Sequence, residues 1–289
     1  SFTPSPNHKA VYLLFDGLDT YAHVYLNDSL LFKGNNMFRY WKKNVKEKLM
    51  KGENSLRIVF YPTSIIEKQK VKELSYTLPG DEKVFTRKAA YHYGWDWGPR
   101  FVTCGIWKPV SLVIETGNAI GTNHHFYTTK LTDQEATALL QSEITVHQPT
   151  QIQISVRDKS TETLLGISTH QLKKDTLVQT LLHFNNPKKW WCNGQGEAHL
   201  YQLSIEITDL TNKQKQFHHE EVGLRTIELI QEADSIGTSF YFKLNGKPLF
   251  SKGANYIPPD NFLPRVTDET YETIVQKAKE ANMNMLRVW

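Results

Sequence analysis

One stretch of the sequence combines the residue types that recognise sugars. Residues 91–101 read YHYGWDWGPRF and hold two tryptophans, one carboxylate and two glycines. A tryptophan face stacks on the C–H face of a sugar ring, and a carboxylate accepts hydrogen bonds from neighbouring hydroxyl groups. The glycines and Pro99 favour a shaped loop. Trp95, Asp96 and Trp97 therefore form either one wall of a sugar site or a packing cluster with a turn carboxylate, and at least one of the tryptophans should face the core.

Two further loops carry candidate binding residues. Residues 189–201, KWWCNGQGEAHLY, offer a tryptophan pair between turn-forming residues. They could form a second sugar platform, but a loop that caps a β-sandwich is the stronger interpretation. Residues 252–265, KGANYIPPDNFLPR, follow an expected strand and precede an expected helix, which is where βα proteins build their active sites. Asn255, Tyr256 and Asp260 are the candidates there, against a purely structural, proline-stiffened loop.

Arg287 and Trp289 lie at the end of an expected interior strand. A buried arginine needs a partner charge, so Arg287 implies a carboxylate that this chain does not obviously supply. The strand end is also a position from which side chains reach an active site in βα proteins. Both residues are therefore candidate site residues.

We expect neither a metal nor a cofactor. The adjacent pairs His124-His125 and His218-His219 would point to opposite faces of a strand, so they are poor joint ligands and fit surface histidines better. The two cysteines are far apart, in no metal-like spacing. The sequence contains no Gly-rich phosphate loop and no nucleophile elbow.

Composition excludes several classes of partner. The formal net charge is only +4, and the lysines are scattered rather than gathered in a basic run. Nucleic acid is therefore not an expected partner. No apolar run approaches the roughly 20 residues of a membrane-spanning helix, so no membrane partner is expected either. The composition is that of an ordinary globular protein, with 39% hydrophobic and 22% charged residues.

The elements that would position these loops are mostly strands. Alternation of apolar and polar residues with period two, broken by turn signals, runs through residues 1–115 and predicts a β-sandwich of the jelly-roll kind. The residues expected to face its core include Ala22, Val24, Leu26, Leu56, Ile58, Phe60, Val110, Leu112 and Ile114. A second alternating region, residues 116–232, predicts an immunoglobulin-like sandwich. Its expected core residues include Ile144, Val146, Ile152, Ile154, Val156, Leu203, Ile205 and Ile207.

The period changes in the third region, residues 233–289. Asn245-Gly246 predicts a hairpin with a type I′ turn. A helix should then start after Thr267 as its N-cap and close at Asn282 in a left-handed turn. Its expected apolar face consists of Tyr271, Ile274, Val275 and Ala278. The final strand completes a βαβ unit, which needs a parallel sheet and cannot bury its own strands.

Both ends of the chain suggest a piece of a longer protein. Residue 1 is Ser, the first sandwich lacks opening strands, and the last residues, MNMLRVW, form a strand without a following turn. Together with the single βαβ unit, this predicts a truncated barrel or sheet at the C-terminal end.

Long segments of the sequence resemble β-mannosidases of glycoside hydrolase family 2. The segments VFTRKAAYHYGWDWGPRFVTCGIWKPVSL, WWCNGQGEAHLYQLSIEI, VGLRTIEL, FYFKLNGKPLFSKGANYIPPDNFLPRVTDETY and AKEANMNMLRVW carry the resemblance, in register and nearly from end to end. The resemblance implies a mostly β chain with a jelly-roll domain over 1–115, an immunoglobulin-like sandwich over 116–232 and the first βαβ unit of a truncated (β/α)₈ barrel over 233–289.

The resemblance also implies an activity. Enzymes of this kind hydrolyse terminal, non-reducing β-mannosyl residues of oligosaccharides with retention, and they use two glutamates whose carboxyl groups lie about 5 Å apart. Both glutamates are expected beyond Trp289, so we expect this chain alone to be inactive. Glu221, Glu228 and Glu232 have no claim to the role.

The substrate side of the site carries over to residues of this chain. Asp96 matches the aspartate that reaches toward the glycone hydroxyls, and Trp95 matches its neighbour. Asn255 lies in the loop after the first barrel strand. Arg287 matches the arginine that holds the nucleophile carboxylate, and Trp289 matches a tryptophan that lines the glycone subsite. The resemblance implies a β-mannoside oligosaccharide as substrate, no cofactor and no particular oligomeric state.

Three other functions stay open at this point. A different glycosidase of the same family, such as a β-galactosidase or β-glucuronidase, is disfavoured by the GWDWGPR form of the loop. A noncatalytic carbohydrate-binding module is disfavoured by the βα segment, which such a module does not need. A pure interaction protein built from sandwiches is the weakest of the three.

Overall fold

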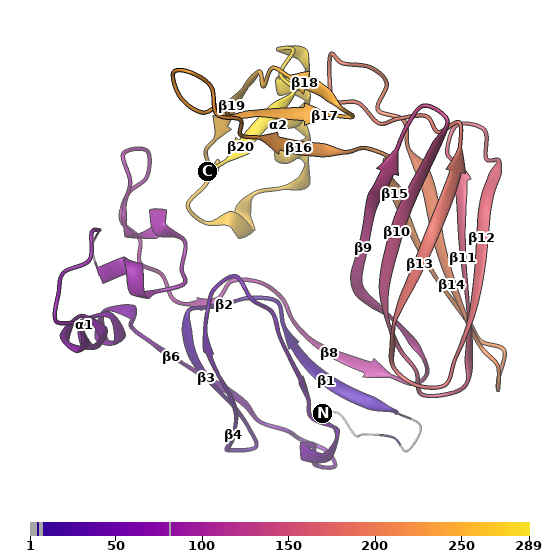
Figure 1. Cartoon of the computed structure of the whole chain (residues 1–289). Helices are drawn as coiled ribbons and strands as arrows, with labels where there is room; N and C mark the ends of the chain where they lie inside the picture. Colours follow the sequence, from indigo (N-terminus) through magenta and orange to yellow (C-terminus); the bar gives the residue numbers. More distant parts are fainter. Residues whose placement is uncertain (1–4, 6–7, 81) are drawn as a thin grey trace. The chain divides into compact units, whose positions relative to one another are not determined.

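The chain is mostly β and divides into two compact units (Figure 1). The structure, a computed structural model, describes residues 5, 8–80 and 82–289, and the backbone alone at 119–122. The first unit comprises residues 1–116 and 258–267, and the second comprises residues 117–257 and 268–289. No helix among the described residues is long and apolar enough to cross a membrane.

The first unit holds two three-stranded antiparallel sheets, ordered β5-β1-β8 and β4-β3-β6, and a small pair, β2-β7. Its strands are β1 (Ala10–Phe15), β2 (Leu18–Asp19), β3 (Tyr21–Leu26), β4 (Ser29–Asn35), β5 (Trp41–Asn44), β6 (Leu56–Tyr61), β7 (Gly105–Ile106) and β8 (Val110–Glu115). One helix, α1 (Thr63–Glu73), follows β6. Strands from both sheets contribute to one apolar core, which identifies a sandwich.

The period-two pattern predicted part of this core correctly. Ala22, Val24 and Leu26 of β3 are buried, as the alternation predicted. Ile58, Phe60 and Val110 are only partly buried against the core. The prediction was wrong for Leu56 of β6, which is 40% exposed. It was also wrong for Leu112 and Ile114 of β8, which are 37% and 40% exposed. They pair with buried residues of β1 on the same face, but β8 is the edge strand of its sheet. Alternation identifies the face of a strand, and an edge position decides how well that face is covered.

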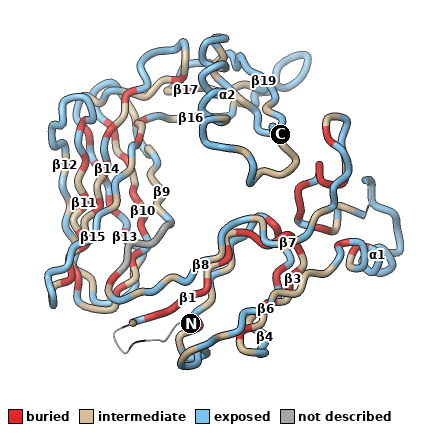
Figure 2. The backbone as a smooth tube through the Cα atoms, turned by 180° about the vertical axis from the view of Figure 1, so that it is seen from behind, coloured by how far each residue is buried: buried red, intermediate tan, exposed pale blue. Residues whose placement is uncertain are grey.

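The second unit contains a sandwich of a three-stranded sheet, β13-β10-β9, and a four-stranded sheet, β12-β11-β14-β15. Its strands are β9 (Ala119–Leu131), β10 (Glu135–Thr145), β11 (Thr150–Asp158), β12 (Leu164–Leu172), β13 (Thr176–Asn185), β14 (Tyr201–Asp209) and β15 (Lys215–Val222). Figure 2 shows buried residues along the strands of these facing layers. The predicted core residues are all buried there, including Ile152, Ile154 and Leu203, which have no exposed surface.

The end of the second unit holds a three-stranded antiparallel sheet and a strand–helix–strand segment. The sheet, ordered β16-β17-β18, consists of β16 (Ile227–Ile230), β17 (Tyr241–Leu244) and β18 (Lys247–Leu249). Asn245 and Gly246 join β17 to β18 with φ of 51° and 78°, which confirms the predicted type I′ turn. The last elements are β19 (Gly253–Tyr256), α2 (Asp268–Glu280) and β20 (Met285–Val288).

Strands β19 and β20 form a parallel pair around α2, as predicted. They approach so closely that a Cβ on Gly253 would lie 2.0 Å from the Met285 carbonyl oxygen, so this position requires glycine. Asn282 ends α2 with φ of 57°, also as predicted. The expected apolar face of α2 is not buried in this structure, since Tyr271 is 40% and Val275 is 59% exposed.

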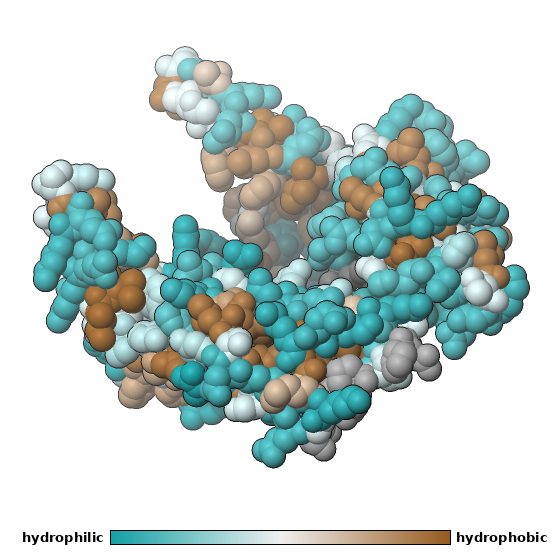
Figure 3. Space-filling model, turned by 90° about the horizontal axis from the view of Figure 1, so that it is seen from below, coloured by the Kyte–Doolittle hydropathy of each residue, from teal (hydrophilic) through white to brown (hydrophobic). Residues whose placement is uncertain are grey.

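The surface is mixed in polarity. Figure 3 shows apolar residues as separate patches among hydrophilic ones on the face that it views. An amphipathic chain of this composition must leave some apolar atoms in water, so scattered patches alone identify no binding surface.

Candidate functional site

Trp95 and Asp96 lie in a tight turn that faces solvent. The Trp95 N–H donates to the Gly98 carbonyl at 2.9 Å, and the Gly98 N–H donates to the Trp95 carbonyl at 3.2 Å. Trp95 is 45% exposed and Asp96 is also exposed. Trp97 is half-buried, with its ring centroid 5.2 Å from that of Tyr91. The turn therefore presents one aromatic ring and one carboxylate, while the second tryptophan anchors it.

A buried ion pair links the segments that precede and follow this turn. The Lys88 ammonium pairs with Asp19 and donates to the Thr103 carbonyl at 2.8 Å. The Thr103 hydroxyl donates to Asp19 at 3.0 Å. Burial lowers the pKa of Lys88, and the hydrogen bond to Asp19 opposes that shift. Because Lys88 precedes the turn and Thr103 follows it, the pair fixes the base of the loop.

Helix α1 provides a second support below the turn. Glu67, which is buried, accepts hydrogen bonds from the hydroxyl groups of Tyr93 and Thr86, the latter at 2.6 Å. Burial and the Glu67 hydrogen bond raise the pKa of Tyr93 to about 12, so its hydroxyl stays protonated as a donor. Arg100 donates to the Tyr93 carbonyl at 3.1 Å from the other side of the turn. The backbone that leads into the turn is thus held by several polar contacts.

Asp260, one of the sequence candidates, stabilises its own segment. It accepts a hydrogen bond from the Phe262 N–H at 2.7 Å and forms an ion pair with Arg265 at 2.7 Å. The hydrogen bond from Arg265 is the main reason that the pKa of Asp260 is lowered. These contacts favour a structural role for Asp260.

Of the other predicted site residues, Asn255 and Arg287 lie on β19 and β20, and Trp289 directly follows β20. Asn255 is the register partner of Arg287, and the Arg287 guanidinium donates to the Asn255 side-chain oxygen at 3.2 Å. The Trp289 N–H donates to the Tyr256 carbonyl at 3.0 Å. Arg287 is exposed here, and its partner is an amide, which leaves the guanidinium able to take a carboxylate as well. Burial raises the pKa of the Tyr256 hydroxyl.

The predicted residues therefore form two sets, Trp95 with Asp96 and Asn255 with Arg287 and Trp289. The first set belongs to the first compact unit and the second set to the second unit.

The loop of residues 189–201 uses its aromatic faces for packing. The Arg225 guanidinium carbon lies 4.5 Å from the centroid of the Trp190 ring, and the Lys247 ammonium lies 5.2 Å from the centroid of the Trp191 ring. The Asn193 amide donates to two carbonyl oxygens at the C-terminal end of α2, those of Lys279 and Met283, each at 3.1 Å. This geometry favours the structural interpretation of the loop.

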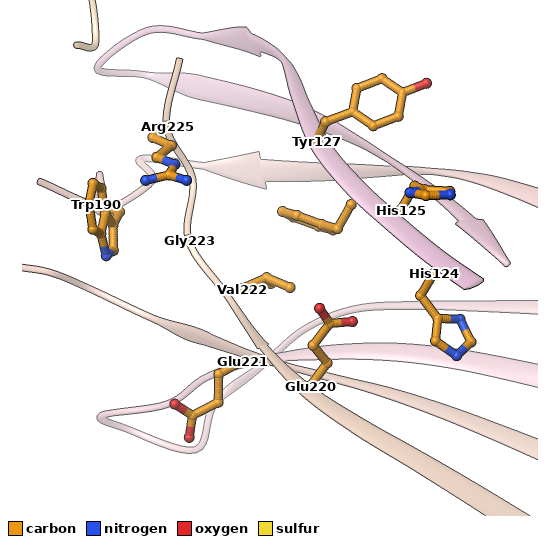
Figure 4. Close-up of a pocket in the computed structure, with 10 residues that line it drawn as sticks. His124, His125, Tyr127, Trp190, Glu220, Glu221, Val222, Gly223 and Arg225 are labelled. Atoms are coloured by element: carbon orange, nitrogen blue, oxygen red, sulfur yellow. The ribbon is translucent and has the colours of Figure 1, made fainter. Parts of the chain in front are cut away.

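The second unit also has an open groove of about 620 Å³ at the edges of strands β9 and β15 (Figure 4). The residues that line it are His124, His125, Phe126, Tyr127, Trp190, Glu220, Glu221, Val222, Gly223 and Arg225. Glu220 and Glu221 are neighbours on one strand, and Figure 4 shows their carboxylates pointing apart. Glu221 pairs with Lys159 at 2.6 Å. Two carboxylates in this arrangement cannot act on opposite sides of one glycosidic bond.

Sequence reasoning missed several residues that shape these sites. Lys88, His92 and Asn261 contact the turn or its base. His92 and Asn261 lie in loops that the sequence marked as candidates, but neither was named as a site residue. The rings of His124 and His218 lie in tilted contact, with their centroids 4.2 Å apart. All of these contacts join residues far apart in the chain. No cluster of three or more metal-ligating side chains occurs among the residues that the structure describes.

Comparison with known proteins assigns a family to most of the chain. Residues 1–108 match the glycosyl hydrolase 2 galactose-binding domain-like family, and residues 120–225 match glycosyl hydrolases family 2. The chain is 31% identical to β-mannosidase B of Aspergillus clavatus, over 98% of this chain and 34% of that protein. It thus spans about a third of the length of the curated relatives that it matches.

Solved structures give the same assignment. The crystal structure of a β-D-mannosidase from Dictyoglomus thermophilum matches with a TM-score of 0.88 and 34% identity, over 100% of this chain and 36% of that one. A β-glucuronidase from Bacteroides uniformis matches with a TM-score of 0.67 and 16% identity, over 100% of this chain and 32% of that one. At that identity, the second likeness concerns the fold alone.

Proposed function

Because residues 1–108 and 120–225 belong to glycoside hydrolase family 2, we propose that this chain is part of a β-mannosidase. The intact enzyme would release terminal, non-reducing β-D-mannose from oligosaccharides or glycoconjugates, with retention of configuration. The likeness to the Dictyoglomus thermophilum β-D-mannosidase over the whole chain is the observation that carries this proposal.

In this proposal the turn of the first unit binds the mannose ring. Asp96 accepts hydrogen bonds from glycone hydroxyls, and Trp95 offers a ring face beside it. The exposure of both side chains supports these roles, because a binding group must be accessible to its ligand. Trp97, packed on Tyr91, holds the turn in shape.

The β19–β20 pair contributes the remaining residues. Asn255 and Trp289 contact the glycone, and Arg287 holds the nucleophile carboxylate. The planar guanidinium can bind the Asn255 oxygen and a carboxylate at the same time, because it carries five donors in a fixed fork. Holding the carboxylate in its ionised form would keep it ready for attack on the anomeric carbon.

The finer architecture is also part of the proposal. The first sandwich, residues 1–115, would be a jelly roll, and the second, residues 116–232, an immunoglobulin-like domain. Residues 233–289 would begin a (β/α)₈ barrel, supported by the parallel β19–β20 pair around α2. The loop after β19 and the end of β20 are then positions where such barrels build active sites.

The acid/base and nucleophile glutamates of this proposal lie beyond Trp289, so the 289-residue chain alone should be inactive. The test compares this chain with the full-length protein on 4-nitrophenyl β-D-mannoside. We expect turnover by the full-length protein only. Turnover by the 289-residue chain at a similar rate would contradict the proposed location of the glutamates.

A related glycosidase specificity is the second candidate, supported by the shared fold of the Bacteroides uniformis β-glucuronidase. The same assay with 4-nitrophenyl galactoside and glucuronide distinguishes it. Preference of the full-length protein for either substrate over the mannoside would replace β-mannosidase with that activity.

A further inference from the structure

A segment that is distant in sequence clamps the Asp96 turn. Residues 258–267 follow β19 in the chain, yet they pack on the first sandwich and belong to its compact unit. The His92 ring donates from Nε2 to the Asn261 carbonyl at 2.8 Å, and the Asn261 side-chain amide donates to the Pro99 carbonyl at 3.1 Å. The rings of Phe101 and Phe262 add an apolar contact, with centroids 5.6 Å apart.

These contacts hold both sides of the turn through one residue. His92 lies in the short 3-10 helix Ala90–Tyr93 that leads into the turn, and Pro99 follows directly after it. Asn261 bonds to both, through its backbone on one side and its side chain on the other. It therefore spans the base of the turn that carries Asp96.

Gly98 shows how closely Asn261 fits the turn. A Cβ on Gly98 would lie 2.9 Å from the Asn261 side-chain oxygen, a distance that real Cβ contacts do not show. A larger residue at 98 would therefore require the Asn261 side chain to shift from its position against the turn. Gly98 and Trp95 close the turn through two backbone hydrogen bonds. Asn261 therefore contacts the backbone of the turn at a residue that closes it.

His92 suits this role because of its burial. It is only 3% exposed, and burial lowers its pKa, so the ring stays neutral. A neutral ring that donates from Nε2 has a fixed tautomer and orientation. A cavity of about 220 Å³ lies beside the clamp and is lined in part by His92, Asn261 and Phe262.

We propose that Asn261 is a positioning residue for substrate recognition, which acts by fixing the orientation of Asp96. The proposal rests on the proposed function, in which Asp96 binds the glycone. Asp96 is exposed at the tip of the turn, so the conformation of the turn backbone sets the direction in which its carboxylate points. Small errors in the placement of a binding group cost large factors in rate.

The first test is a double-mutant cycle in the full-length protein on 4-nitrophenyl β-D-mannoside. Asn261→Ala should lower kcat/KM by about tenfold, as expected for loss of an orienting hydrogen bond. In an Asp96→Ala background, the same substitution should lower kcat/KM by less than about twofold. Asn44→Ala, which removes an exposed asparagine at the end of β5 in the same unit, is the control and should leave kcat/KM unchanged.

Two outcomes separate the clamp from the proposed function. If Asp96→Ala leaves kcat/KM unchanged, the proposed role of Asp96 fails. If Asp96→Ala lowers it but Asn261→Ala lowers kcat/KM by the same factor in both backgrounds, Asn261 is structural only and the clamp is wrong.

One variant and one measurement test the geometry independently of activity. Amide hydrogen exchange at Trp95 and Gly98 should accelerate about tenfold in Asn261→Ala, because the side-chain hydrogen bond to the Pro99 carbonyl is lost. Unchanged exchange at both amides would overturn the proposal.

Discussion

The buried pair of Lys88 and Asp19 should be one of the most sensitive points of the first unit. The Lys88 side chain is 0% and the Asp19 side chain 3% exposed, and both bond to Thr103 as well. Removing one charge leaves the other buried without its counter-ion, which typically costs about 3–5 kcal/mol. Asp19→Asn and Lys88→Met should each reduce the free energy of unfolding of this unit by about that amount.

The double variant provides the stronger test of this reasoning. Asp19→Asn combined with Lys88→Met leaves no uncompensated charge, so its cost should fall well below the sum of the two single costs. Lys42→Met breaks an ion pair with Glu115 in the same unit, but Lys42 is 40% exposed. It should change the free energy of unfolding by less than about 1 kcal/mol.

Urea denaturation of the 289-residue chain, followed by tryptophan fluorescence, measures these differences. Four of the seven tryptophans, Trp41, Trp95, Trp97 and Trp107, belong to the first unit. Single-variant costs below about 1 kcal/mol, or a double variant whose cost equals the sum, would refute the argument that each buried charge requires the other as its counter-ion.

Three further predictions concern other residues. Burial lowers the pKa of His92, so the unfolded state binds the proton more readily. Stability should therefore be complete above about pH 6.5 and fall as the pH drops below it, and His92→Gln should reduce that slope in urea titrations between pH 5 and pH 7. Tyr201→Phe should reduce the free energy of unfolding by about 1–3 kcal/mol, because the buried hydroxyl bonds to both the N–H and the carbonyl of Lys188. Tyr127 is exposed, so Tyr127→Phe is the control and should leave the free energy of unfolding unchanged. Arg287→Lys should lower kcat of the full-length protein on 4-nitrophenyl β-D-mannoside at least about tenfold, because lysine lacks the planar guanidinium group. The melting temperature should change little. An unchanged kcat would contradict the role of Arg287.

Local signals predicted the elements of this fold well. The alternation in β3, β11 and β14 identified buried faces correctly, and Asn245-Gly246 identified a turn, because both signals depend on neighbouring residues. The same alternation was wrong for Leu56, Leu112 and Ile114, because exposure on an edge strand depends on what lies across from it.

Long-range contacts could not be predicted from the sequence. The Trp95–Gly98 turn was expected as a loop with candidate binding residues, but its supports were not. Lys88 meets Asp19 across 69 positions, and His92 meets Asn261 across 169. No periodicity or motif reports such pairs, because they form only when distant segments fold together.

The specificity constant of the full-length protein for 4-nitrophenyl β-D-mannoside, measured for the native enzyme and for Asp96→Ala, tests the central claim most directly. We predict that the native enzyme prefers the mannoside to the corresponding galactoside and glucuronide. We also predict that Asp96→Ala lowers kcat/KM by at least about a hundredfold, because a charge-assisted contact to two hydroxyls is lost, while the melting temperature is unchanged. An Asp96→Ala enzyme with native activity, or a native enzyme that does not act on the mannoside, would contradict the assignment of this turn as a mannose-binding wall.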